Sequence, residues 1–406
     1  MKNIIALIIS LLIIKVAFTQ TSTELFYDGD SLYGARDFKN AGLAYATGIR
    51  GKGSEAMLFR YVFCAGMWSL GGEPDSAFHY LDIISGSDKI SLADIDGIKN
   101  NSDFIPIKKD KRWEPMIAKI SDQAKKNSFP QEELIYGRKD GMSLTMLWIK
   151  PKIRANGKAI ICVQSGAWVS AFAGTEILQF YLKKGYSLFA VMHGSQPRYA
   201  IPDAVNDLKR AVRYVRYNAV KFGIDPNHIG ITGFSSGGHL SLAVAMAEEK
   251  IDSMANDPVD RVSSRVQVAA VLYPPTDFLN WGKENFDILQ DKVLMKNVRL
   301  GEAFNFKTYD RRARTLNIIS DSVLKYKIIK EISPIYSISS DDPPVFILHG
   351  DADGIVPLQQ SESFITKLRQ TGVVNKLIIK KGVGHGVEDM LPELYQFSDW
   401  FDKYLK

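Results

Sequence analysis

A serine flanked by glycines is the strongest chemical signal in this sequence. It lies in Gly233-Phe234-Ser235-Ser236-Gly237, a G-x-S-x-G pattern that follows the apolar run 229–232 and precedes a helical pattern over 240–247. At a strand-to-helix turn of this kind, a serine can be held in a strained conformation with its hydroxyl exposed. The glycines leave room for the tightly folded backbone on either side. The placement therefore predicts that Ser235 is a nucleophile.

A serine hydroxyl reacts poorly at pH 7 and needs a base to take its proton. The chain has six histidines, and His385 stands out because it lies in the glycine-rich loop 382–386, after the last predicted strand. Glycines there let the backbone carry an imidazole over a sheet to the serine. We therefore predict that His385 is the base. We expect His239 to point away from the turn and down onto the sheet, and expect structural or loop-fixing roles for His79, His228 and His349.

The elements that must position these residues alternate between strands and helices from about residue 130 onward. An antiparallel hairpin is predicted from runs 133–136 and 143–149, which an Asp-Gly turn joins. Further strands are predicted at 159–163, 187–192, 228–232, 266–273, 345–349 and 376–380, and helices at 174–184, 203–222 and 358–370. Continuously apolar strands alternating with helices indicate a mostly parallel sheet covered on both faces. The long stretch 275–342 predicts a helical insertion near the mouth of the site.

The region 130–406 resembles α/β-hydrolase esterases of the type that includes acetylxylan and feruloyl esterases, the BD-FAE-like group. Gly-Phe-Ser-Ser-Gly-Gly-His-Leu at 233–240 and Asp-Pro-Asn-His-Ile at 225–229 carry most of this likeness. The resemblance implies an α/β-hydrolase fold and hydrolysis of carboxylic esters through an acyl-enzyme, without a cofactor. The natural acyl and alcohol groups are left open, because a fold determines chemistry more firmly than substrate.

The resemblance also indicates the third member of a catalytic triad. The segment 349–357, His-Gly-Asp-Ala-Asp-Gly-Ile-Val-Pro, is similar to the H-G-x-x-D-x-x-V-P segment of the family and places the acid at Asp353. Asp351 is the competitor, and we expect it to hold the loop through backbone hydrogen bonds. The chain order Ser235, Asp353, His385 is the order of this fold.

Donors for an oxyanion are expected from two places. One is the backbone N–H of Ser236, the residue after the nucleophile. The other is the loop Gln164-Ser165-Gly166-Ala167-Trp168, where many such esterases have H-G-G-G-W, so that Gln164 stands at the family's histidine. Gly166 and Ala167 are predicted to donate through their backbone N–H groups. Trp168 would line the acyl pocket or pack the loop, and His193, at the end of a strand, is a candidate to face the substrate.

The segment 24–120 has a helical pattern of a different kind. Asp37-Phe38 with Ala41 is echoed 36 residues later by Glu73-Pro74 with Ala77. Small residues at such a period let paired helices stack closely, and the stretch resembles about two tetratricopeptide repeats. A docking role for a protein partner is one interpretation, and a structural appendage is the other.

The first 19 residues are typical of a secretory signal. Lys2 gives a positive start, the segment 4–14 is apolar apart from one serine, and small residues at 17–19 precede a cleavage site ahead of Gln20. We therefore expect a periplasmic or secreted protein with no membrane span after signal removal. Cys64 and Cys162, which fall in separate predicted domains, are expected to be buried free thiols.

Composition excludes some classes of function. Net charge is +6, or +4 without the two lysines of the signal segment, and basic residues are interspersed with acidic ones, which argues against nucleic-acid binding. No cluster has metal-ligand spacing and no glycine loop matches a nucleotide site. Two alternatives to an esterase stay open: a serine peptidase of the prolyl-oligopeptidase type, and a repeat-based binding protein with a vestigial hydrolase site.

Overall fold

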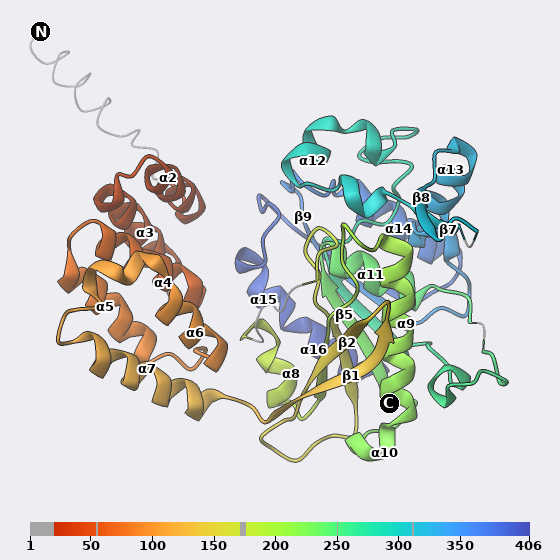
Figure 1. Ribbon diagram of the computed structural model, residues 1–406, viewed down its shortest axis with the longest axis horizontal. Coiled ribbons are helices and arrows are strands. Elements are labelled where there is room, and N and C mark those ends of the chain that lie inside the picture. The colour runs from red at the N-terminus through yellow and green to blue at the C-terminus, as the bar shows by residue number, and fades with distance from the viewer. Residues whose placement is uncertain (1–19, 54–55, 171–175, 250, 311) are drawn as a thin grey trace, which may run out of the picture. The chain divides into compact units, whose positions relative to one another are not determined.

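The computed structural model describes residues 20–53, 56–170, 176–249, 251–310 and 312–406. The chain divides into two compact units, 1–128 and 129–406, whose elements are labelled in Figure 1. The expected signal segment lies outside the described residues, so it stays a prediction. Within the described ranges, no helix combines the length and apolar character needed to cross a membrane.

Regular structure in the described part of the first unit is helical: α2 (Ser22–Gly34), α3 (Phe38–Lys52), α4 (Leu58–Leu70), α5 (Pro74–Ser85), α6 (Leu92–Asn100), η2 (Ser102–Ile107) and α7 (Trp113–Asn127). The starts of α3 and α5 are 36 residues apart, as the echo in the sequence predicted, and Ala41 and Ala77 are both fully buried. A Cβ atom at Gly42 would lie 2.8 Å from the Trp68 ring, so a small residue permits this close helix packing. The assignment to tetratricopeptide repeats stays a prediction.

The second unit is built on an eight-stranded sheet in the order β1-β2-β4-β3-β5-β6-β9-β10. Its strands are β1 (Gln131–Lys139), β2 (Met142–Ile149), β3 (Ala159–Val163), β4 (Ser187–Val191), β5 (Ile229–Phe234), β6 (Val268–Leu272), β9 (Val345–Gly350) and β10 (Asn375–Lys380). β2 pairs antiparallel with both β1 and β4, and the other neighbours are parallel. The mostly parallel sheet with an antiparallel N-terminal hairpin is thus confirmed.

The hairpin turn forms where the Asp-Gly pair predicted it. Asp140 and Gly141 have φ values of 47° and 79°, which suits the two-residue turn that matches strand twist.

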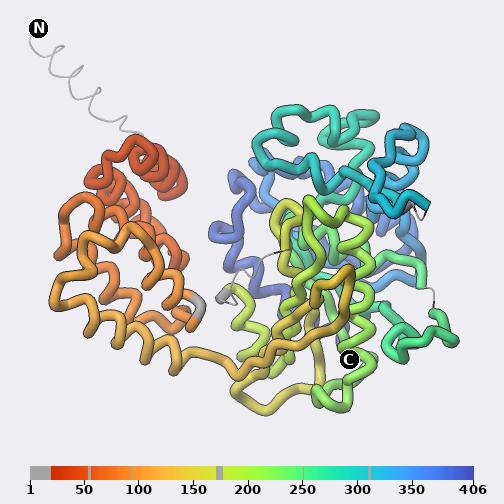
Figure 2. Tube along the Cα trace, viewed as in Figure 1, coloured from red at the N-terminus to blue at the C-terminus, as the bar shows by residue number. Residues whose placement is uncertain are grey.

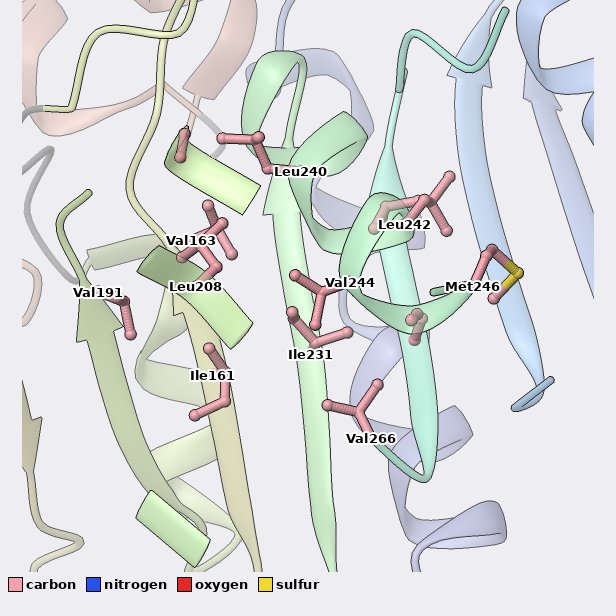
Figure 3. Close-up of a cluster of buried hydrophobic side chains, with 14 of the residues drawn as sticks. Ile161, Val163, Val191, Leu208, Ile231, Leu240, Leu242, Val244, Met246 and Val266 are labelled. Carbon is pink, nitrogen blue, oxygen red and sulfur yellow. The ribbon is translucent and has the colours of Figure 1, made fainter. Parts of the chain in front are cut away.

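Helices cover both faces of the sheet, because strands buried on two sides need apolar cover on each. One face packs against α9 (Ile201–Tyr217) and α11 (Ser236–Ala245). Figure 3 shows side chains of this contact, among them Ile161, Val163, Leu208, Ile231, Leu240 and Val244. On the other face, a Cβ atom at Gly230 would lie 2.4 Å from the Phe401 ring of α16 (Gln396–Tyr404). Cys64 and Cys162 are buried and unpaired, as predicted.

The insertion 275–342, which Figure 2 traces at the top of the unit in cyan to blue, is only partly helical. It contains η5 (Ile288–Gln290), α12 (Lys292–Asn297), η6 (Gly301–Phe304), β7 (Lys307–Asp310), β8 (Thr315–Ile318), α13 (Ser322–Glu331) and η7 (Pro334–Ser337). The antiparallel pair β7–β8 was not expected. The sequence of β8, Thr-Leu-Asn-Ile, alternates polar and apolar residues over only four positions, and every one of them is exposed, so this alternation is at the lower length limit for recognising a strand.

Candidate active site

Ser235 occupies the sharp turn between β5 and α11. Its φ and ψ angles are 53° and −123°, an unusual conformation for a residue with a side chain. A Cβ atom at Gly233 would lie 2.3 Å from the carbonyl oxygen of Gly237, and one at Gly237 would lie 2.8 Å from that of Val163. Both glycines are therefore required for the turn, as predicted, and the turn exposes the serine hydroxyl at the end of the strand.

The three residues predicted as a triad are joined by hydrogen bonds. His385 Nε2 lies 3.0 Å from Ser235 Oγ, and His385 Nδ1 lies 2.7 Å from Asp353 Oδ2. An ionised carboxylate only accepts, so Nδ1 carries the proton and Nε2 is free to accept the serine O–H. Asp353 follows β9 and His385 follows β10, which places both at the carboxyl ends of parallel strands.

Asp353 is held in its ionised form by its surroundings. Its Oδ1 accepts the backbone N–H groups of Ile355 and Val356, both at 2.9 Å. Its Oδ2 faces His385 Nδ1 and also lies 3.3 Å from His349 Nε2. Burial acts to raise the pKa of Asp353, but the hydrogen bonds from His349, His385 and the backbone outweigh it and hold the pKa well below its usual range.

The competing carboxylate has the structural role expected of it. Asp351 Oδ1 accepts the backbone N–H of Gly382 at 2.5 Å, at the base of the loop that carries His385. His349 likewise fixes a loop, because its Nδ1 lies 2.7 Å from Ser361 Oγ and its Nε2 lies 3.0 Å from the Val356 carbonyl oxygen. The geometry therefore selects Asp353 rather than Asp351 as the partner of the imidazole.

Gly350 lets the loops of the acid and the base approach each other. A Cβ atom there would lie 2.1 Å from the carbonyl oxygen of Val383. We expect Gly350→Ala to lower the unfolding free energy by about 3 kcal/mol and to displace His385, so that Ser235 loses reactivity toward a fluorophosphonate. Thermal unfolding and labelling rates measure both effects. Gly354→Ala is the control, because nothing lies within 4 Å of its Cβ position; equal effects of the two variants would contradict the prediction.

Tyr273 is a site residue that sequence reasoning missed. Its ring centroid lies 4.2 Å from that of His385, and its φ of 36° is unusual for a tyrosine. The residue directly follows β6, in the same position relative to its strand as Ser235 has after β5. That placement at a parallel strand's carboxyl end was the available signal.

The predicted oxyanion loop forms a tight turn. The N–H of Gly166 donates to the carbonyl oxygen of Val169 at 3.0 Å, and the reverse bond is 2.9 Å. Between them, Ala167 and Trp168 have φ values of 49° and 57°, a left-handed conformation that costs residues with a Cβ about 1–2 kcal/mol each. Gly166 is therefore not available as an oxyanion donor, contrary to the prediction, because its N–H closes the turn. Among the described residues, no acceptor is found for the N–H of Ala167.

The N–H of Ser236 is the second available donor. Ser236 is the first residue of α11, where helix geometry leaves N–H groups without a partner in the same helix. No described residue accepts from it. Its side-chain hydroxyl lies 3.1 Å from that of Ser165, which links the start of the helix to the loop 164–168.

Trp168 packs the loop instead of lining an open pocket. It is 4% exposed, and its indole N–H donates to His239 Nδ1 at 3.0 Å. The rings of Phe278 and Phe304 also contact it. His239 thus faces the loop and the insertion. The expectation that it points down onto the sheet is wrong, because its ring nitrogens bond Trp168 in the loop and Ile332 in the insertion.

His193 is almost completely buried. It is 5% exposed, and its backbone N–H donates to Ser170 Oγ. Its Nε2 atom is buried, with no hydrogen-bond partner among the described residues. The burial favours a structural role over the substrate-facing one considered from the sequence.

Burial of His193 and His239 makes the fold sensitive to acid. Burial lowers the pKa of each to about 4, from an ordinary value of 6.5. Between these pH values the unfolded chain binds a proton that the folded protein does not, so stability falls as pH decreases from 6.5 to 4. Over that pH range, each of the two histidines lowers the free energy of unfolding by about 3 kcal/mol.

We expect His239→Asn to show a smaller difference in unfolding free energy between pH 7 and 4.5 than the wild type, in urea titrations. His228→Gln is the control, because this partly exposed histidine lies at the start of β5 outside the core. Identical pH dependence in the wild type and His239→Asn would contradict the assignment.

An apolar cavity of about 320 Å³ lies beside the turn of Ser235. It is lined by β3 and its loop, by η3 (Glu176–Leu178) and by the end of β5: Cys162, Val163, Gln164, Ser165, Gly166, Val169, Ile177, Leu178, Thr232, Gly233 and Phe234. A cavity of this size can hold a short or aromatic group of a small ligand. In the described residues, no group of three or more His, Cys, Asp or Glu side chains is arranged to hold a metal ion.

Comparisons with known proteins agree with this architecture. Residues 147–368 match the BD-FAE family, a range that includes Ser235 and Asp353 and ends before His385. The probable carboxylic ester hydrolase LipM of Mycobacterium tuberculosis is 31% identical over 240 residues, 58% of this chain and 50% of that protein. The esterase LipQ of the same organism is 28% identical over 250 residues, 59% of this chain and 53% of that protein. The chain thus spans about half the length of these curated relatives.

Solved structures are similar to about two thirds of the chain. A truncated carbohydrate esterase from gut microbiota is 26% identical with a TM-score of 0.54, covering 68% of this chain and 97% of that one. An acetyl ester-xyloside bifunctional hydrolase from Caldicellulosiruptor lactoaceticus is 24% identical with a TM-score of 0.52, covering 67% and 96%. The second likeness bears on the fold alone.

Proposed function

The chain belongs to the BD-FAE family, and on that premise we propose that it hydrolyses carboxylic esters through an acyl-enzyme formed on Ser235. The observation that carries the proposal is the unbroken line of hydrogen bonds from Ser235 through His385 to Asp353. A serine so placed can lose its proton as it attacks, which the hydroxyl alone cannot do at neutral pH.

The reaction follows from the arrangement of these groups. Ser235 Oγ attacks the ester carbonyl carbon while its proton moves to His385 Nε2, and Asp353 stabilises the imidazolium that forms. The N–H groups of Ser236 and Ala167 donate to the developing oxyanion. The C–O bond to the alcohol then breaks, and His385 gives its proton to the leaving oxygen. Water then attacks the acyl-enzyme by the same steps, with His385 again taking the proton and returning it to Ser235 Oγ, and the carboxylic acid is released.

The substrates we propose are acyl esters of polysaccharides or small molecules. Similarity to a carbohydrate esterase supports the polysaccharide class, and the apolar cavity beside Ser235 supports a short or aromatic acyl group. We propose that residues 1–19 direct export to the periplasm or the medium, where such polymers occur, and that the helical unit offers a surface to a protein partner.

The proposal is tested on the protein that begins at Gln20. We expect turnover of short-chain aryl esters and release of acetate from acetylated xylan, with no cleavage of chromogenic dipeptides. A fluorophosphonate should modify one serine, and mass spectrometry of the digest should place it on Ser235 rather than on the adjacent Ser236. Peptide cleavage without ester turnover would replace the proposal with a peptidase. A folded protein inactive on every substrate and unlabelled would favour a binding protein with a vestigial site.

A further inference from the structure

The turn that carries Ala167 is held by a contact that the mechanism above does not use. Ala167 and Trp168 both have left-handed backbone conformations. Residues with a Cβ atom persist in such conformations only where the surroundings impose them. The side chain of Trp168 is the part of this turn that is most firmly packed, since the rings of His239, Phe278 and Phe304 all contact it.

His239 accepts a hydrogen bond from Trp168 with one ring nitrogen and donates one to the insertion with the other. Its Nδ1 lies 3.0 Å from the indole nitrogen, which can only donate, so Nδ1 accepts. Its Nε2 therefore carries the proton in the neutral ring and donates to the carbonyl oxygen of Ile332 at 2.7 Å. The imidazole is fully buried, so both bonds are shielded from competing water and fix one tautomer.

This position connects the two donors of the oxyanion site. His239 lies on α11, three residues after Ser236, and its bond to Trp168 holds the residue that directly follows Ala167. A single side-chain hydrogen bond thus links the helix that supplies one N–H to the turn that supplies the other. Gln196 supports the turn independently, because its amide nitrogen donates to the Ala167 carbonyl oxygen at 2.9 Å.

We propose that His239 is a positioning residue that sets the separation of the Ser236 and Ala167 N–H groups by holding Trp168 against α11. The inference rests on the proposed function, since it concerns the oxyanion of that reaction. Correctly spaced donors stabilise charge that exists in the transition state and not in the bound ester. Loss of the hydrogen bond therefore lowers kcat and leaves KM nearly unchanged.

Two substitutions of the same residue separate the hydrogen bond from mere packing. In His239→Asn the amide oxygen takes the place of Nδ1 and still accepts from Trp168. In His239→Gln the longer amide reaches the place of Nε2 and the acceptor for the indole is lost. We expect His239→Gln to lower kcat about 10- to 100-fold on an aryl acetate. His239→Asn should stay within about threefold of the wild type, because it retains the acceptor.

Trp168→Phe removes the donor of the same bond and should match His239→Gln. The Trp168→Phe/His239→Gln double variant should be no worse than either single one, because the two residues act through one bond. All rates are measured at a temperature where circular dichroism shows every variant folded. Equal losses in His239→Gln and His239→Asn, or a loss confined to KM, would overturn the inference.

A second readout does not depend on turnover. The indole N–H signal of Trp168 in ¹⁵N-tryptophan spectra, assigned with Trp168→Phe, should be protected from hydrogen exchange in the wild type and in His239→Asn, and should lose protection in His239→Gln. Lost protection with unchanged kcat would overturn the positioning role while leaving the esterase proposal intact. A wild type that turns over no ester would overturn both the esterase proposal and the positioning role of His239. Retained protection in His239→Gln would refute the hydrogen bond itself.

Discussion

Ser235→Ala is expected to lower kcat on aryl acetates by about 10⁶-fold, because it removes the hydroxyl that is hydrogen-bonded to His385 and that we propose forms the acyl-enzyme. The backbone should be unaffected: serine already carries a Cβ atom at a φ of 53°, so alanine meets no new strain. The variant should remain folded by thermal unfolding and should no longer react with a fluorophosphonate. The loss of kcat is measured by steady-state kinetics on aryl acetates, with variant protein purified free of wild-type enzyme.

Ser236→Ala is the matched control for that substitution. It removes a neighbouring hydroxyl, with its contact to Ser165 Oγ, but it keeps the backbone N–H that we propose as an oxyanion donor. We expect kcat within about threefold of the wild type, since one hydrogen bond between two neutral hydroxyls contributes only about 1 kcal/mol. A loss as large as that of Ser235→Ala would contradict the assignment of the nucleophile, as would wild-type turnover by Ser235→Ala.

Asp353→Asn is expected to lower kcat by about 10⁴-fold. The amide oxygen of the asparagine should keep the place of Oδ1, where two backbone N–H groups donate. Its NH₂ group then faces His385, whose Nδ1 must accept. The proton moves to Nε2, which can no longer take the proton of Ser235. The variant therefore retains the geometry of the triad and loses its base, so KM should change far less than kcat.

Asp351→Asn tests whether the effect belongs to Asp353 alone. An asparagine at 351 can still accept the Gly382 N–H through its amide oxygen, and it does not touch His385. We expect kcat within a few-fold of the wild type in the same aryl acetate assay. Comparable losses at 351 and 353 would show that the loop as a whole, rather than the carboxylate at 353, supports the base.

Much of the catalytic unit could be predicted because its signals are local. Buried parallel strands are short continuous apolar runs, so β3 was predicted at 159–163 and has those bounds. The Asp-Gly turn and the serine turn each depend on the conformational freedom of glycine at defined positions. Ser235, Asp353 and His385 all lie at the carboxyl ends of parallel strands, and such ends share one edge of a sheet.

Other features could not be predicted because they depend on contacts between distant segments. The sequence does not reveal whether a backbone N–H will donate within its own turn. Gly166 was therefore assigned wrongly as an oxyanion donor, since its N–H donates to the Val169 carbonyl oxygen. The direction of the His239 side chain depends on a tryptophan 71 residues away. The contact between the rings of Tyr273 and His385 joins the ends of two strands that are not neighbours in the sheet. The strand β8 is exposed along its whole length, so no burial against the core accompanies its short alternating pattern, Thr-Leu-Asn-Ile.

Sequence alone predicted the three side chains that the structure joins by hydrogen bonds, and the fold that brings them together. Motif, spacing and strand periodicity are properties of short segments, and they suffice to order Ser235, Asp353 and His385 along one sheet edge. The tertiary structure was needed to show that the Gly166 N–H closes its own turn and that His239 holds the residue after Ala167. That arrangement depends on the packing of Trp168 between His239 and the insertion, where segments remote in the chain meet and hydrogen-bond partners are assigned by three-dimensional contact alone.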